Sequence, residues 1–147
     1  MPAAAGREAA TGRVAEVMGG EADRRERMVL IVDDEAATRA LLRQTLQGLP
    51  FPCRVYEAAS GDEALKVTHE IRPDLALVDI MLPASSVSGV LLCQQMCKDS
   101  RTKVAIVSGQ ATEMIVNACL IAGAVGYVRK PFSIEEMRDR VTDWLSA

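Results

Sequence analysis

Acidic residues and a lysine follow short strand-like runs at three distant places in the sequence. Asp33-Asp34-Glu35 follows MVLIV, Asp79 follows LALV, and Lys130 follows GYVR. Carboxylates gathered in one place repel one another unless a cation or hydrogen bonds compensate them. Mg²⁺ prefers such oxygen ligands and often lies beside a phosphate. These residue types therefore indicate phosphoryl transfer onto an acid side chain, a known use of Asp as a nucleophile.

The elements that must position these residues alternate along the chain. Strand-like runs lie at residues 28–32, 53–58, 75–79, 103–108 and 126–130. Helical patterns lie near residues 36–48, 61–71, 88–98, 111–122 and 133–145. Strands that are apolar on both faces and separated by helices predict a parallel sheet covered on both sides. Right-handed crossovers then give an α/β three-layer sandwich.

Residues typical of helix ends support these helix predictions. Ser60 with Glu63, and Ser133 with Glu136, have the capping-box spacing expected at the starts of the second and fifth helices. Gly123 predicts the end of the fourth helix.

Parallel strands end at one edge of their sheet, where ligands of such folds bind. The acids after the first and third strands, Ser108 at the end of the fourth and Lys130 after the fifth are therefore expected to meet there. Asp33, Asp34 and Asp79 would serve as ligands or outer-sphere acceptors of Mg²⁺, while Ser108 and Lys130 would bind phosphoryl oxygens.

Four motifs at these positions, VLIVDDE, LALVDIMLP, VAIVSG and GYVRKPF, resemble the receiver domain of two-component response regulators. The resemblance spans roughly residues 28–146, and the joint occurrence of the four motifs in this order is highly specific. It implies a flavodoxin-like (βα)5 sandwich with a five-stranded parallel sheet in the order 2-1-3-4-5.

The resemblance also implies roles at matching positions. Asp79 would be the phosphoacceptor, and Mg²⁺ would be held by Asp33, Asp34, Asp79 and the backbone carbonyl of Met81.

Ser108 would be the hydroxyl that moves toward the phosphoryl group, and Lys130 its counter-ion. Tyr127 matches an aromatic position that changes orientation on activation. The Lys130-Pro131 peptide bond is commonly cis in this family.

The resemblance implies a stand-alone, chemotaxis-regulator-like switch that catalyses its own phosphorylation and dephosphorylation but is not otherwise an enzyme. A sensor histidine kinase or a histidine phosphotransfer protein would donate the phosphoryl group. The output would be binding to an unknown downstream protein, or passing the phosphoryl group along a relay. A homodimer through the fourth helix, fifth strand and fifth helix is a further expectation.

Composition sets the expected compartment and partners. The net charge of −3 with no dense basic patch argues against direct DNA binding. No apolar run is long enough to span a membrane, and no secretory signal is evident, so we expect a cytoplasmic protein without membrane partners.

The chain of 147 residues fits one main domain. Residues 1–27 lack the apolar groups of a core, so they are expected to be a flexible or loosely helical extension, with a partner-binding helix as the alternative; residues 28–147 form the receiver. The cysteines, which lack a metal-site pattern, are expected to be reduced and buried. They are Cys53, Cys93, Cys97 and Cys119.

The single histidine of the chain, His69, is expected on a helix surface.

Other interpretations of these residues are open. Asp33 and Asp34 could cap the first helix, Ser108 could be a turn residue, and Tyr127 could be core filler. The whole domain could be a pseudo-receiver, a protein-interaction module that works without phosphorylation. An aspartate-nucleophile phosphatase is weaker, because Met81 stands where such an enzyme usually has a second acid.

The loop after the third strand is longer than the family pattern. Six positions separate Pro83 from Gly89, where the family commonly has four. The extra residues are either a tolerated surface insertion or a functional one. In the functional interpretation, residues 84–88 form part of a partner-docking surface or alter access to the phosphate.

Overall fold

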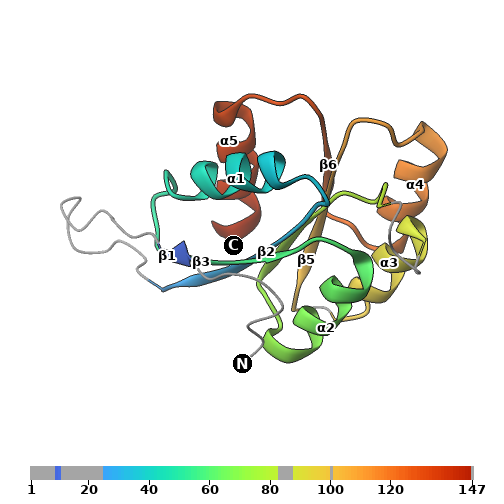
Figure 1. Cartoon of the computed structure of the whole chain (residues 1–147), viewed down its shortest axis with the longest axis horizontal. Coiled ribbons are helices and arrows are strands. Elements are labelled where there is room, and N and C mark those ends of the chain that lie inside the picture. Colours follow the sequence, from blue (N-terminus) through green and yellow to red (C-terminus); the bar gives the residue numbers. More distant parts are fainter. Residues whose placement is uncertain (1–8, 11–24, 83–87, 100, 147) are drawn as a thin grey trace.

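The computed structural model describes residues 9–10, 25–82, 88–99 and 101–146, which form a sheet between two layers of helices (Figure 1). The strands are β1 (Ala9–Ala10), β2 (Arg27–Val32), β3 (Cys53–Ala58), β4 (Leu75–Val78), β5 (Lys103–Ser108) and β6 (Gly126–Arg129). The helices are α1 (Ala36–Leu46), α2 (Gly61–Ile71), α3 (Gly89–Met96), α4 (Glu113–Ala122) and α5 (Ile134–Ser146).

The strand order is β1-β3-β2-β4-β5-β6. All neighbouring pairs from β3 to β6 are parallel, and only β1 pairs antiparallel, with β3. Without β1 this is the order 2-1-3-4-5, so the predicted flavodoxin-like fold is confirmed.

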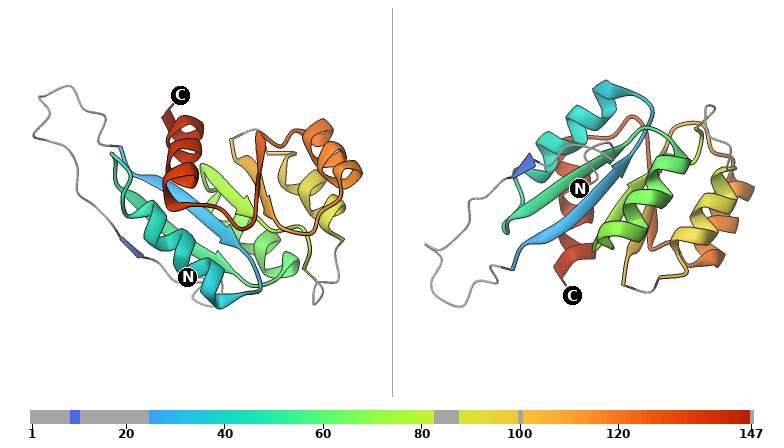
Figure 2. Two further views of the ribbon diagram at one scale, coloured as in Figure 1. Left: turned by 90° about the horizontal axis from the view of Figure 1, so that it is seen from above. Right: turned by 60° about the horizontal axis from the view of Figure 1, so that its bottom comes forward.

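Both faces of the sheet are buried because successive side chains of a strand point to opposite faces. On β2, Leu30 and Val32 contact the core under α2, α3 and α4, whereas Val29 and Ile31 contact the core under α1 and α5. The views in Figures 1 and 2 show these helix layers on either side of the strands. This two-sided burial explains why the strands read as continuous apolar runs.

Hydrogen bonds confirm the predicted helix starts. Ser60 Oγ accepts the backbone N–H of Glu63 at 3.2 Å, and Ser133 Oγ accepts that of Glu136 at 2.9 Å. Gly123 ends α4 with a φ of 124°, a left-handed conformation that glycine adopts readily.

Several details differ from the sequence-based expectation. The short strand β1 was not predicted, and β2 begins at Arg27, one residue early. The division at residues 27 and 28 stays a prediction, because most of the proposed extension lies outside the described residues. Residues 84–87 of the long loop also lie outside them, whereas Ser88 caps α3 by accepting the N–H of Leu91 at 3.2 Å.

Within the described part of the chain, no helix has the length and apolar character needed to cross a membrane.

Candidate functional site

Four strands bring side chains to one edge of the sheet. Asp33 follows β2, Asp79 follows β4, Lys130 follows β6, and Ser108 is the last residue of β5. The N–H of Asp79 donates to the carbonyl oxygen of Val32 at 2.8 Å, which continues the parallel pairing to this edge. Topology therefore brings together residues that are far apart in sequence.

The ammonium group of Lys130 lies between two buried carboxylates. Its Nζ donates to Asp33 Oδ2 at 2.7 Å and to Asp79 Oδ2 at 2.9 Å. Asp33 is 1% exposed and Asp79 is 7% exposed, so solvent screens these interactions little. Burial alone would lower the pKa of Lys130, but the bonds and charges of the two acids outweigh it and raise that pKa above its ordinary value. Lys130 is therefore held in its charged form.

Burial of Asp33 disfavours its ionised form, and its hydrogen bonds compensate this only in part. Removal from water raises the pKa of its carboxyl above the ordinary value, and the hydrogen bonds from Lys130 and from the backbone of Glu35 oppose this rise without cancelling it. A further cation beside Asp33 would favour its ionised form.

A cluster of carboxylates lies around this position. Oxygen atoms of Asp33, Asp34 and Asp79 all lie within 4.8 Å of one another, with Asp34 exposed to solvent. Three carboxylates and the one ammonium of Lys130 leave a formal charge of −2, which one divalent cation would offset. Oxygen donors open to water on one side suit Mg²⁺, which keeps several of its waters. The residues present therefore fit the cation implied by the sequence.

Backbone N–H groups fix the orientation of both buried acids. Asp33 Oδ1 accepts the N–H of Glu35 at 2.9 Å, and Asp79 Oδ1 accepts the N–H of Met81 at 2.9 Å. In each of the two acids, one carboxylate oxygen thus accepts the backbone N–H of the residue two positions later, and the other accepts a hydrogen bond from Lys130. Glu35 itself occupies the cap position of α1 without a side-chain cap bond, so helix capping does not account for the acids at this place.

Ser108 is in contact with Tyr127 of the neighbouring strand β6. Ser108 is 1% exposed, and its buried Oγ has no hydrogen-bond partner among the residues that the structure describes. The half-buried Tyr127 donates its hydroxyl to the backbone oxygen of Ser108 at 3.1 Å. A buried hydroxyl without a partner is uncommon, and it is available to an incoming oxygen atom.

Asp79, Ser108 and Lys130 border an open cleft of about 340 Å³. It is lined by Asp34, Glu35, Asp79, Met81, Ser108, Gly109, Gln110 and Lys130. Asp33 is absent from this lining, so of the two buried acids only Asp79 faces the cleft. Glu35 and Gly109 had no predicted role of their own. Gly109 leaves room for the Lys130 side chain, because a Cβ at position 109 would lie only 3.3 Å from Cβ of Lys130.

A second group of charges supports the end of β2 and was not predicted. Arg39 of α1 donates to the backbone oxygen of Asp33 at 2.7 Å and to Glu57 of β3 at 2.9 Å. Glu57 also forms an ion pair with Arg43. No single motif marks these residues, because the pairing depends on how α1 crosses β3.

Residues expected to lie outside the chemistry are indeed elsewhere. His69 is exposed on α2, and none of the four cysteines forms a disulfide bond. Cys53, Cys93 and Cys119 are buried as expected. The expected burial was wrong for Cys97, which is partly exposed because it is the capping residue just beyond the end of α3. The sulfur atoms of Cys93 and Cys97 lie 3.9 Å apart.

Comparisons with known proteins agree with this geometry. The family model described as the response regulator receiver domain matches residues 29–142. The receiver domain protein (CheY-like) from Methanospirillum hungatei superposes with a TM-score of 0.74 at 28% identity, covering 83% of this chain and 95% of that one.

Two curated relatives are longer proteins. The chain is 37% identical over 115 residues to the probable transcriptional regulator ycf27 of Guillardia theta, covering 77% of this chain and 43% of that protein. It is 33% identical over 119 residues to the DNA-binding response regulator MtrA of Mycobacterium tuberculosis, covering 81% of this chain and 50% of that protein. The chain thus spans about half the length of these relatives.

These relatives correct the expected partners. We expected no direct DNA binding and an unknown protein target, and this expectation is wrong, because the matched relatives include DNA-binding response regulators. The physical reason is that the net charge of −3 describes a chain that spans only about half of such proteins. The charge of this chain therefore does not describe the other half of those relatives.

The fold, the cleft and the matched family model therefore lead to one conclusion: this chain belongs to the receiver domain family of two-component response regulators.

Proposed function

We propose that Asp79 accepts a phosphoryl group from a phosphohistidine of a sensor kinase or of a histidine phosphotransfer protein. The observation that carries this proposal is the position of Asp79 in the open cleft, with its carboxylate bonded to Lys130 at 2.9 Å. Asp33 binds the same lysine but does not line the cleft. A donor can therefore reach Asp79 more readily than Asp33.

Asp33, Asp34, Asp79 and the backbone carbonyl of Met81 would hold Mg²⁺. The cation would offset negative charge on the phosphoryl oxygens as the transfer proceeds. The closeness of the three carboxylates and their unbalanced charge support this assignment.

The transfer exchanges one bond to phosphorus for another. A carboxylate oxygen of Asp79 forms the new bond, and the bond from phosphorus to the donor imidazole nitrogen breaks with its electron pair remaining on nitrogen. Lys130 offers positive charge to the phosphoryl oxygens. Ser108 donates its hydroxyl, which has no hydrogen-bond partner within the described ranges of the chain. The same groups hold the acyl phosphate when water later hydrolyses it, so the chain acts on itself rather than on a substrate.

Phosphorylation would change the site because the phosphoryl group adds about −1.5 to −2 charges and three acceptor oxygens. Movement of Ser108 toward this group would change the contact between its backbone oxygen and the hydroxyl of Tyr127. Tyr127 then adopts a second orientation, and the equilibrium between two packings of β5 and β6 shifts.

We infer the effect of phosphorylation on other molecules from the relatives, because the cleft itself does not indicate it. By analogy with MtrA, which is named a DNA-binding response regulator, phosphorylation of this receiver controls DNA binding by the protein to which it belongs. The stand-alone organisation expected from the sequence stays a prediction, since the curated relatives are about twice as long as the segment they share with this chain.

The test is incubation with Mg²⁺ and acetyl phosphate, followed by the intact mass of the wild-type chain and of Asp79→Asn. We expect one phosphate adduct in the wild type and none in the variant. Beryllofluoride binding provides a second readout that needs no donor. Failure of both, and of transfer from a cognate kinase, would instead support an interaction module that works without phosphorylation.

The DNA-binding output needs a separate measurement on the natural full-length protein. We expect phosphodonor to change the retention of that protein on DNA, and Asp79→Asn to abolish the change. Equal retention with and without phosphorylation would contradict the output while leaving the phosphoacceptor role intact.

A further inference from the structure

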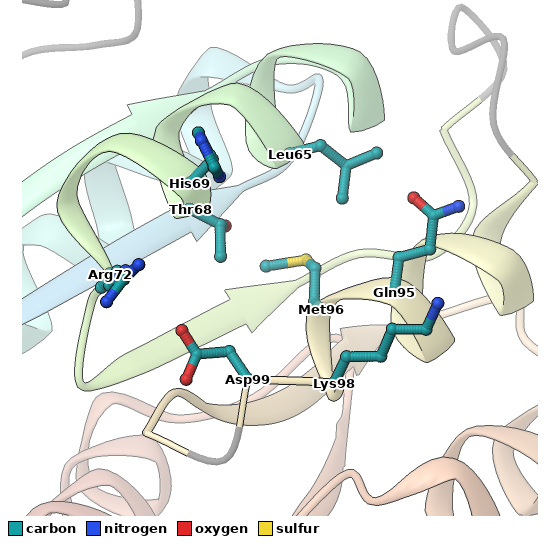
Figure 3. Close-up of a pocket in the computed structure, with 8 residues that line it drawn as sticks. All are labelled: Leu65, Thr68, His69, Arg72, Gln95, Met96, Lys98 and Asp99. Carbon is teal, nitrogen blue, oxygen red and sulfur yellow. The ribbon is translucent and has the colours of Figure 1, made fainter.

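A second cavity, of about 420 Å³, lies between α2 and α3. Figure 3 shows the side chains that line it: Leu65, Thr68, His69, Arg72, Gln95, Met96, Lys98 and Asp99. Its volume falls within the range of about 300 to 1,000 Å³ that is typical of small-molecule sites. It shares no lining residue with the cleft around Asp79.

The position of this α2–α3 pocket separates it from the phosphorylation chemistry. It is formed by the C-terminal half of α2 and by the end of α3 with the two residues beyond Cys97. In a parallel α/β sheet the helix N-termini face the ligand edge, and the helix C-termini lie at the opposite edge. The pocket is therefore a separate place on the domain.

The floor of the pocket is apolar. Met96 is 1% exposed and lies at the centre of the view in Figure 3. Thr68 is also buried, and its hydroxyl donates to the backbone oxygen of Ala64 at 2.7 Å, so its hydrogen-bonding need is already met. Leu65 extends this surface on the side of Gln95. The floor thus suits a hydrocarbon group.

The rim carries two permanent positive charges, on Arg72 just beyond α2 and on Lys98 just beyond α3. His69 and Arg72 are three residues apart at the end of α2, and Lys98 comes from the other side (Figure 3). Within the described part of the chain, neither Arg72 nor Lys98 forms an ion pair. The one acid of the lining, Asp99, already accepts the N–H of Arg101 at 3.0 Å. The rim therefore has two permanent cations available to a ligand.

We propose that the α2–α3 pocket binds a small amphipathic anion. The hydrocarbon part of the ligand lies on Met96 and Leu65, and its carboxylate or phosphate contacts Arg72 or Lys98. Charge and apolar area each contribute, so a ligand with only one of them binds more weakly.

The test compares probes that separate these contributions. Hexanoate and hexyl phosphate carry both features and represent the two anion chemistries, whereas hexanol lacks the charge and inorganic phosphate lacks the hydrocarbon. Each is titrated into the ¹⁵N-labelled chain, with the backbone amide signals of Leu65, Thr68 and Met96 as the readout. The signals of Ser108 and Lys130 report binding at the phosphorylation cleft in the same spectra.

We expect saturable shifts at the pocket amides with at least one amphipathic anion, at least tenfold weaker binding of hexanol, and no pocket shifts with inorganic phosphate. Equal binding of hexanol would overturn the role of the rim cations. Absence of pocket shifts with both amphipathic anions would overturn the site itself.

Variants identify the groups responsible. The pair Arg72→Asn and Lys98→Ala removes both permanent cations, with Asn chosen because Arg72 has a φ of 50° that Asn tolerates. Lys66→Ala is the matched control, an exposed lysine of α2 that does not line the pocket. We expect the paired variant to lose at least tenfold in affinity and the control to keep wild-type affinity. Unchanged binding in a paired variant that still melts cooperatively would reject the proposal.

Discussion

Lys130 joins two buried acids that lie 46 positions apart in the sequence, binding Asp33 at 2.7 Å and Asp79 at 2.9 Å with one ammonium group. This contact links the ends of β2, β4 and β6. It also occupies the same carboxylates that would face a cation and a phosphoryl group, so structure and function depend on the same few atoms.

Replacing Lys130 by Met should therefore destabilise the metal-free domain. Removal of one partner leaves buried carboxylates without compensation, which costs about 3 to 5 kcal/mol in a fully buried pair. Since the Lys130 side chain is 20% exposed, we expect a loss nearer the lower end of that range. Urea denaturation without Mg²⁺ measures it, with Lys66→Met on the exposed face of α2 as the control. A loss no greater than in the control would show that the two contacts do not stabilise the fold.

The three carboxylates should differ in what they contribute. Asp34 is exposed, whereas Asp33 is buried and bonded to both Lys130 and the backbone. We expect Asp34→Asn to weaken Mg²⁺ binding about tenfold, or ~1.4 kcal/mol, with little change in metal-free stability. Asp33→Asn should change both quantities. Calorimetric titration with Mg²⁺ and urea denaturation of each variant separate the two effects; equal behaviour of the two variants would contradict this division.

Ser108→Ala should have opposite effects on stability and on phosphoryl binding. The buried hydroxyl has no partner among the described residues, so its removal should leave stability unchanged or raise it by about 1 kcal/mol. The variant should nevertheless bind beryllofluoride more weakly, because the hydroxyl no longer reaches the phosphoryl mimic. Denaturation without beryllofluoride, and titration with it, give the two numbers. A strong loss of stability would mean that the hydroxyl has a structural partner instead.

The sequence predicted the topology and the meeting of the acids, Ser108 and Lys130, because strand periodicity and parallel order are enough to bring strand ends together. It could not predict the shared contact of Lys130 with Asp33 and Asp79, since ammonium position depends on side-chain conformation. The sequence also did not predict the pairing of Arg39 with Glu57 or the pocket over Met96. Both features depend on how the helices pack on the sheet, which residue spacing within one helix does not determine.

Gly89, the glycine that follows Pro83 in the long loop pattern, is required by a close approach to the backbone of Ile80. A Cβ at this position would lie 2.0 Å from the backbone oxygen of Ile80, so only glycine fits where α3 begins beside the strand end. We expect Gly89→Ala to destabilise the domain by about 2 to 3 kcal/mol, the cost of strong overpacking. Gly48→Ala is the matched control, because its Cβ would meet only the flexible end of Arg138. Thermal melts of both variants measure the difference, and equal melting temperatures would refute the close approach.

Cys53 should make stability depend on alkaline pH. Burial raises the pKa of its thiol from 9.0 to about 12, so between these values the unfolded chain has lost a proton that the folded chain keeps. A raised folded-state pKa gives stability that is complete below pH 9 and disappears as the pH rises toward 12. By pH 10 this one thiol accounts for a loss of about 1.4 kcal/mol. We therefore expect the free energy of unfolding to fall less between pH 8 and pH 10 in Cys53→Ala than in the wild type. Replacing Cys97, which is partly exposed, by Ala should reduce the fall less. The same pH dependence in the wild type and in Cys53→Ala would show that the Cys53 thiol ionises as easily in the folded chain as in the unfolded one.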